Sequence, residues 1–255
     1  MKKFKVAKPL TFNPGTYQRI IQGDCLEVLR GLPDKSVDLV VTDPPYDLKN
    51  INGGGSVNNV KKLNKSLQAL EEADLIHGYD ITAVCTELMR VMKEPNIYIW
   101  CNKAQIPEYF KFFVEKHKCK FDILFWHKTN ALPTYSNKYL TDCEYLLYFR
   151  KGKGKCFPQS YTDASTVYHA PINHADKKKY GHPTIKPLDF TRQVIRNSSR
   201  AGDVVLDPFA GSGTVAVASK IEHRNSIAIE LMEEYVNLIQ QRLFEVGFEE
   251  VFGDE

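Results

Sequence analysis

The regular alternation of apolar and amphipathic segments is the feature of this sequence that most constrains its fold. Short apolar segments typical of buried strands cover residues 37–41, 96–101, 121–126, 144–149, 204–206 and 226–229. Segments typical of helices cover residues 81–92, 107–118, 187–198, 214–221 and 233–244. Strands that alternate with helices predict an α/β fold with a mostly parallel sheet. We therefore expect one such domain over residues 1–255.

Two stretches interrupt the alternation. Residues 47–66 are rich in Gly, Asn and Lys, and residues 151–180 are polar with scattered aromatic side chains and no clear period. Long irregular stretches in a compact domain are usually functional or disordered. We expect a mobile loop at 47–66 and a short insertion at 151–180, both in contact with the substrate.

The segment Asp43-Pro44-Pro45-Tyr46 directly follows the strand expected at 37–41. Two prolines fix φ and remove backbone donors, so the chain leaves the strand as a stiff, extended turn. This places a carboxylate, a carbonyl and an aromatic ring at the carboxyl end of a strand, where ligands bind in open α/β sheets. A simple strand-terminating turn capped by Asp43 is the structural alternative.

These groups match the needs of an amino group on a flat base. The Asp43 carboxylate can accept one amine hydrogen bond and the Pro44 carbonyl the other, while Tyr46 stacks on the ring. Accepting both hydrogens frees the nitrogen lone pair for attack. Because a carboxylate is too weak a base to deprotonate a neutral aryl amine first, positioning supplies much of the rate.

A second motif combines a strand, a glycine turn and a helix over residues 204–221. Gly211 and Gly213 let the backbone approach a ligand closely, and Glu230 ends the next strand, in the position from which an acidic side chain holds a ribose. The segment lacks the Gly-Lys-Ser/Thr of a phosphate loop and the third glycine of a dinucleotide fingerprint. An adenosine ligand without a pyrophosphate remains, and S-adenosylmethionine fits. A glycine turn beside a solvated Glu230 is the structural alternative.

Together the two motifs resemble the amino-group DNA methyltransferases, over most of the chain. The catalytic motif precedes the cofactor loop, which is the permuted order of the beta class. Further similar segments lie at residues 22–25, 126–130 and 181–187. The resemblance implies a Rossmann-like methyltransferase fold, with a seven-stranded sheet that has one antiparallel strand and is flanked by helices.

The resemblance also extends the candidate site. It implies that His182, Thr184 and Lys186 contact the methionine end of the cofactor, and that Asp24 lies near the adenine. The candidate cofactor-binding residues are then Asp24, His182, Thr184, Lys186, Asp207, Phe209, Ala210, Gly211, Ser212, Gly213, Thr214 and Glu230. The candidate catalytic residues are Asp43, Pro44, Pro45 and Tyr46. No metal ligands are expected, because the His and Cys residues lack metal-binding spacing.

Double-stranded DNA is the expected substrate, with the target base flipped out of the duplex. The formal charge of +3 is too small to indicate a nucleic-acid partner, so any basic surface must be local. Basic residues suited to phosphate contacts are Lys151, Lys153, Lys155, Lys177, Lys178 and Lys179. Solvated surface charge is the alternative for each of them.

Several functions remain open at this stage. Adenine N6 and cytosine N4 offer similar amine edges; Asp43 favours adenine, since the family more often has Ser at this position for cytosine. An RNA or protein amide methyltransferase, and a binding module without catalysis, are further alternatives. A homodimer and a cognate restriction endonuclease are candidate partners. No apolar stretch approaches a membrane span, and residues 1–4 are not followed by an apolar export segment, so a cytoplasmic location is expected.

Overall fold

A computed structural model describes residues 10–13, 16–46, 79–133, 139–152, 155–182 and 184–252. Its strands are β1 (Leu10–Asn13), β2 (Thr16–Gln22), β3 (Leu39–Thr42), β4 (Asn96–Cys101), β5 (Lys120–Lys128), β6 (Cys143–Arg150), β7 (Val167–Ala170), β8 (Val204–Asp207) and β9 (Asn225–Glu230). Its helices are α1 (Cys25–Arg30), α3 (Ile81–Val91), α4 (Ile106–Tyr109), the π-helix η1 (Phe110–Lys116), α5 (His174–Tyr180), α6 (Leu188–Ser198), α7 (Thr214–Ile221) and α8 (Glu233–Phe252).

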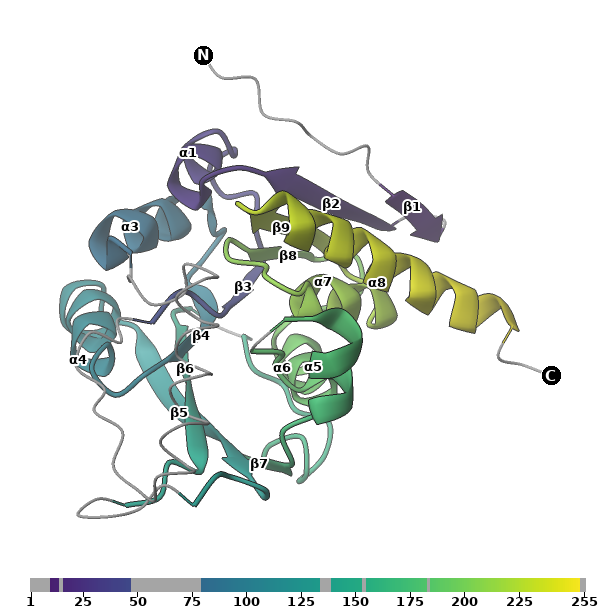
Figure 1. Cartoon of the computed structure of the whole chain (residues 1–255). Coiled ribbons are helices and arrows are strands. Elements are labelled where there is room, and N and C mark those ends of the chain that lie inside the picture. Colours follow the sequence, from purple (N-terminus) through teal and green to yellow (C-terminus); the bar gives the residue numbers. More distant parts are fainter. Residues whose placement is uncertain are drawn as a thin grey trace.

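The strands of the described residues form one sheet in the order β1-β2-β9-β8-β3-β4-β6-β5-β7 (Figure 1). β6 runs antiparallel to both of its neighbours, and β1 pairs antiparallel with β2 at one edge. The other strand pairs are parallel. The α/β prediction is confirmed. The seven strands from β2 to β5 in this order contain one antiparallel strand, as expected, and β1 and β7 extend the sheet at its two edges.

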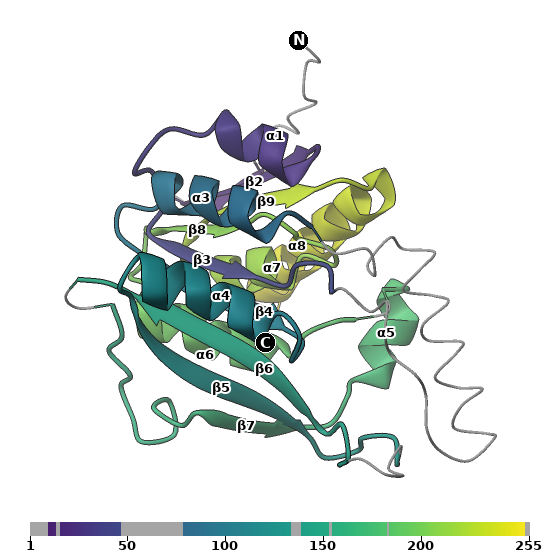
Figure 2. The same ribbon diagram turned by 90° about the vertical axis from the view of Figure 1, so that its left-hand side faces the viewer.

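Helices cover both faces of the sheet. α1, α3 and α4 lie on one face, and α6, α7 and α8 lie on the other (Figures 1 and 2). Alternate residues of β4 show how the sequence builds this arrangement: Ile97 and Ile99 join the core under α3, whereas Tyr98 and Trp100 pack with α6. A strand buried on both faces needs a continuous apolar run, which explains the absence of polar alternation in β4.

The carboxyl ends of the parallel strands meet at one edge of the sheet. Register pairs Val40 with Leu206, so β3 and β8 end side by side, and Gln22 with Glu230, so β2 and β9 do too. Because β6 is antiparallel, its first residues reach this edge; its register pairs Tyr145 with Cys101. This edge therefore receives both predicted motifs.

The segment predicted as an insertion at residues 151–180 contains regular structure that the sequence pattern did not predict. Val167–Ala170 forms β7, which pairs in parallel with β5, and His174–Tyr180 forms α5. Asn173 caps α5 through its side chain, and Gly181 ends the helix with a positive φ. The mobile loop predicted at 47–66 lies outside the described residues. None of the described helices is long and apolar enough to cross a membrane.

Candidate active site

The predicted catalytic carboxylate and aromatic side chain lie together at the end of β3. The Tyr46 hydroxyl donates to Asp43 Oδ1 over 2.8 Å, and Lys186 Nζ lies 2.9 Å from Asp43 Oδ2. Gln105 Nε2 donates to the Pro45 carbonyl over 3.2 Å, which fixes the turn from the side of β4. The two prolines therefore lead into a turn whose carboxylate is held at both oxygens.

Lys186 connects this turn to β6 and β5. Its Nζ lies 2.8 Å from Glu144 Oε2, and Lys128 Nζ lies 2.6 Å from Glu144 Oε1. Lys186 also donates to the Tyr46 hydroxyl over 3.2 Å. The side chains thus form a row of alternating charge, Lys128–Glu144–Lys186–Asp43, which we call the charge row.

Burial and charge act against each other in the charge row. Burial would raise the pKa of Glu144, but the ammonium groups of Lys186 and Lys128 outweigh it and lower that pKa to about 2. Burial raises the pKa of Asp43, although Lys186 and the Tyr46 hydroxyl counteract the shift. The two carboxylates raise the pKa of Lys186 despite its burial. Lys186 is therefore a cation, and Glu144 an anion, at neutral pH.

The second motif forms a glycine turn between β8 and α7. Glu230, at the end of β9, accepts hydrogen bonds from Gly211 N at Oε2 over 2.7 Å and from Met232 N at Oε1 over 2.9 Å. Gly211 and Gly213 have φ values of +49° and +77°, a region that glycine adopts without strain. A hydrogen bond thus fixes the glycine turn to the Glu230 carboxylate, 19 residues after Gly211.

His182 packs against the glycine turn. A Cβ added to Gly211 would lie 3.0 Å from His182 Nε2, so the absence of a side chain at Gly211 makes room for the ring. His182 Nδ1 accepts from Thr184 N over 3.2 Å, whereas its buried Nε2 has no partner among the described residues. Burial and nearby cations lower the pKa of His182 to about 4, so the ring is neutral at pH 7.

The two motifs contact each other directly. Thr42 Oγ1, one residue before Asp43, donates to Asp207 Oδ1 over 2.9 Å, and Phe209 N donates to the same oxygen over 3.1 Å. Burial raises the pKa of Asp207 to about 7. The segment that carries both His182 and Lys186 also bridges the glycine turn and Asp43. The turn that carries Asp43 and the glycine turn therefore lie side by side at one edge of the sheet.

The remaining candidate cofactor residues lie around the glycine turn or beside β9. Ala210 N donates to the Ile229 carbonyl, and Ser212 Oγ lies 3.3 Å from Thr214 Oγ1. Asp24 is exposed and caps α1 by accepting from Glu27 N over 3.0 Å. Because Gly23 N donates to the Glu230 carbonyl, Asp24 lies close to the end of β9.

The basic residues divide into two groups. Lys177, Lys178 and Lys179 occupy the last turn of α5, and α5 follows the carboxyl end of β7 on the edge that carries Asp43 (Figure 2). Lys151 and Lys155 instead follow the carboxyl end of the reversed strand β6, at the opposite edge. The structure does not bring these two lysines near Asp43, and Lys153 lies outside the described residues.

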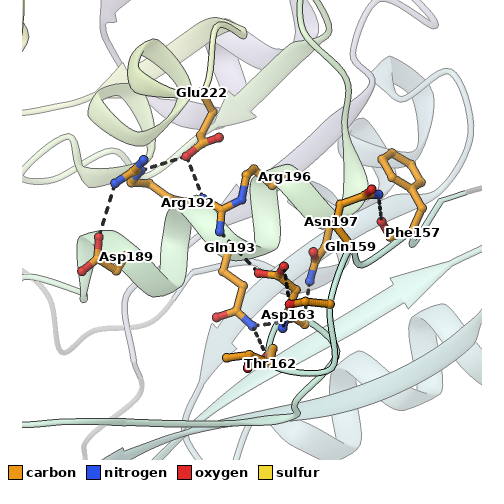
Figure 3. Close-up of polar contacts among 11 residues, drawn as sticks. Phe157, Gln159, Thr162, Asp163, Asp189, Arg192, Gln193, Arg196, Asn197 and Glu222 are labelled. Atoms are coloured by element: carbon orange, nitrogen blue, oxygen red, sulfur yellow. Dashed lines mark hydrogen bonds and ion pairs between the residues drawn. The ribbon is translucent and has the colours of Figure 1, made fainter. Parts of the chain in front are cut away.

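The irregular segment before β7 is tied to α6 (Figure 3). Asn197 Nδ2 and Gln193 Nε2 donate to the Asp163 carbonyl over 2.7 and 3.0 Å. Arg196 joins the Asp163 carboxylate at 3.4 Å to Glu222 Oε1 at 2.9 Å, and so links the segment to the end of α7. This part of the predicted insertion is therefore held against the scaffold.

Two members of the charge row, Glu144 and Lys128, could not be recognised from the sequence pattern. The pattern predicts a strand around Glu144 and a family-like segment around Lys128, but it indicates no role for either side chain. A signal exists in hindsight: Glu144 is an acid at the start of an otherwise apolar strand, and buried acids need a partner. Which cation would approach it depends on the reversal of β6, which the local sequence does not encode.

Comparison with known proteins identifies the family. The family model N6_N4_Mtase, described as DNA methylase, matches residues 37–241. The chain belongs to this DNA methylase family. Among curated relatives of this DNA methylase is the type II methyltransferase M2.LlaDCHI of Lactococcus lactis subsp. cremoris, 28% identical over 243 residues that cover 88% of each chain. The type II methyltransferase M2.MboI of Moraxella bovis is 26% identical, over 89% of this chain and 88% of its own.

Solved structures agree with the fold of the DNA methylase. The crystal structure of the M1.HpyAVI-SAM complex has 25% identity and a TM-score of 0.63, and the match covers 89% of this chain and 100% of that one. The PvuII cytosine-N4-specific DNA methyltransferase has 17% identity and a TM-score of 0.68, over 99% and 98% of the two chains. At this identity the second likeness shows the fold alone.

Proposed function

We propose that this DNA methylase transfers a methyl group from S-adenosylmethionine to N6 of adenine in double-stranded DNA. The observation that carries the proposal is the contact between the two motifs. Thr42, which precedes Asp43, is hydrogen-bonded to Asp207, which opens the glycine turn. A group that accepts amine hydrogens and a loop suited to adenosine therefore lie at one edge of the sheet, where ligands bind in α/β proteins.

The residues around the glycine turn fit S-adenosylmethionine. Each Glu230 carboxylate oxygen accepts one backbone N–H and retains acceptor capacity for a ribose hydroxyl. The buried, unpartnered Nε2 of His182 offers a further polar contact beside the glycine turn. Glu230 is the proposed ribose ligand, and His182, Thr184 and the residues from Asp207 to Thr214 surround the rest of the cofactor. When bound, S-adenosylmethionine supplies an electrophilic methyl group.

The chain's own contribution to the reaction is to hold the amine. Both Asp43 oxygens already accept a hydrogen bond or ion pair, from Tyr46 and Lys186, which fixes the plane of the carboxylate. A carboxylate has about four lone-pair sites, so Asp43 can accept an amine N–H without releasing either partner. The Pro44 carbonyl is the proposed second acceptor, and Tyr46 is the proposed stacking surface for the flipped base.

Cytosine N4 is the second candidate. Its amine carries the same two N–H donors, so the geometry at Asp43 suits both bases. The choice of adenine rests on Asp43 itself, because the family more often places Ser there in cytosine enzymes. The PvuII enzyme does not decide the matter, since its similarity to this chain extends to the fold alone.

Methyl transfer to DNA tests the proposal. The purified protein should transfer labelled methyl from S-adenosylmethionine to duplex DNA, and Asp43→Ala should abolish the transfer. Asp34→Asn is the matched control, because Asp34 is an exposed acid that pairs with Arg90 at the surface. Full activity of Asp43→Ala would refute the role of Asp43, and N4-methylcytosine in digested product would replace adenine as the target.

Contacts with partners extend the proposal. We infer that Lys177, Lys178 and Lys179 approach DNA phosphates, because α5 lies at the edge that carries Asp43. Charge reversal of these lysines should reduce the salt dependence of DNA binding by about one phosphate contact each. The homodimer and the cognate restriction endonuclease stay predictions, which sedimentation of the protein and coexpression with a neighbouring nuclease can test.

A further inference from the structure

Three polar groups surround the Lys186 ammonium in the interior of the site. Its ammonium nitrogen lies 2.9 Å from Asp43 Oδ2, 2.8 Å from Glu144 Oε2 and 3.2 Å from the Tyr46 hydroxyl. The contacts with the two carboxylates are ion pairs, and the contact with Tyr46 is a hydrogen bond. Only 8% of the side chain is exposed. These buried contacts differ from exposed ion pairs, which contribute little to the stability of proteins.

The surroundings of Lys186 hold it in place. Its ammonium lies 5.1 Å from the centroid of the Trp100 ring and 5.4 Å from that of Tyr46. Aromatic faces attract a cation, most strongly where water is excluded. Lys186 can therefore not swing into solvent without losing two carboxylates and two ring contacts.

We propose that Lys186 and Glu144 are positioning residues that orient the Asp43 carboxylate and balance its charge for amine binding. The inference rests on the proposed function of Asp43 and deepens it. Lys186 attracts Asp43 directly, whereas Glu144 shares the same ammonium and so limits how strongly Asp43 is neutralised. Lys128, on the far side of Glu144, completes a row whose formal charges cancel.

The charge balance at Asp43 has several contributors. Lys186 and Tyr46 stabilise its ionised form, and Glu144 opposes ionisation, against a background of burial that also opposes it. Further titratable groups that interact electrostatically with Asp43 are Cys101 in β4, Tyr109 in α4 and Asp207 in β8. Among these groups Lys186 is the one cation, so its removal and the removal of Glu144 should affect Asp43 in opposite directions.

This role differs from the one predicted from sequence. A contact between Lys186 and the methionine end of the cofactor would make Lys186→Met weaken cofactor binding at every pH. A role at Asp43 instead predicts a change in the pH profile of transfer, with cofactor affinity altered by less than about threefold. The two roles are therefore separable by measurement.

The test compares the acid limb of single-turnover methyl transfer in Lys186→Met, Glu144→Gln and the parent protein. An opposite charge within about 4–6 Å shifts a carboxyl pKa by about 1–3 units. The apparent pKa of the acid limb should therefore rise by about one unit or more in Lys186→Met, so that transfer at pH values below the limb becomes about tenfold slower. The same pKa should fall in Glu144→Gln. Lys93→Met is the control, because Lys93 pairs with Asp38 at the other edge of the sheet.

A second measurement does not depend on activity. In protein labelled with ¹³C at the Asp carboxyl groups, the Asp43 signal, assigned through Asp43→Asn, should titrate with the same opposed shifts in the two variants. If Lys186→Met does not fold, Glu144→Gln decides alone, since Gln keeps the shape of Glu. The inference would be overturned if the pKa of the acid limb and the pKa of Asp43 did not change, or if they changed in the same direction in both variants. If the parent protein methylates no DNA but the two variants still show opposed shifts of the Asp43 titration, the coupling would be supported and the proposed function refuted.

Discussion

Gly213 is a position in the described part of the chain where a single added methyl group would meet a buried core side chain. It is the N-cap of α7, with a φ of +77°, and a Cβ built there would lie 2.7 Å from Cγ1 and 2.9 Å from Cγ2 of Ile239. Ile239 belongs to α8 and is fully buried. Gly213→Ala must therefore either shift α8 or distort the glycine turn.

The magnitude follows from two separate costs. A left-handed backbone costs an L-residue about 1–2 kcal/mol. Forcing a methyl group into a packed core costs about 1–3 kcal/mol more. Gly213→Ala should thus lower the free energy of unfolding by about 2–5 kcal/mol. Gly202→Ala is the matched control, because Gly202 has a φ of +83° and an added Cβ there meets no atom within 4 Å.

Urea unfolding followed by circular dichroism measures both variants against the parent protein. The control should lose about 1–2 kcal/mol, since it bears the backbone cost alone. The difference between the two variants then isolates the contact between Gly213 and Ile239. Equal losses in the two variants would refute the packing of α8 on the glycine turn.

Two further predictions concern the buried acids. Asp207 has a pKa raised to about 7, so its contribution to stability is present at low pH and is lost as the pH rises from about 4 to about 7. Asp207→Asn keeps an acceptor for Thr42 and removes the charge, so its stability relative to the parent should grow across that window by at most about 4 kcal/mol; parallel urea-midpoint curves would contradict this. Glu230→Gln should weaken S-adenosylmethionine binding by about 10–100-fold, from the value of a hydrogen bond to a charged group, with DNA affinity unchanged. Calorimetry with the exposed control Glu233→Gln checks it, and unaltered cofactor affinity would exclude Glu230 as the ribose ligand.

The parts of the fold that follow from local pattern were predictable from the sequence. β4 has the bounds Asn96–Cys101 that its apolar run predicts, and α7 begins and ends at Thr214 and Ile221 as expected. In contrast, β7 is a four-residue edge strand with no fully buried residue, and α5 has no buried residue either. Because β7 is too short for an alternation to be recognised and α5 lacks a buried apolar face, periodicity could not find these two elements.

The candidate site was predictable to a similar extent. Asp43, Tyr46 and the glycine turn were found because stiff or glycine-rich turns after strands have a recognisable local sequence. The partners of Lys186 were not, because Asp43 and Glu144 come from strands far apart in the chain. Long-range ion pairs depend on sheet order, and one sequence alone does not contain that information locally.

The reversed direction of β6 has a consequence for how such an enzyme can change its substrate. β5 ends and β6 begins at the same edge of the sheet as Asp43, and the two strands pair antiparallel. Lengthening or replacing a hairpin tip costs little, because loop-closure entropy grows slowly with length. Changes of sequence between these two strands can therefore be tried while the strands, Glu144 and Asp43 keep their places.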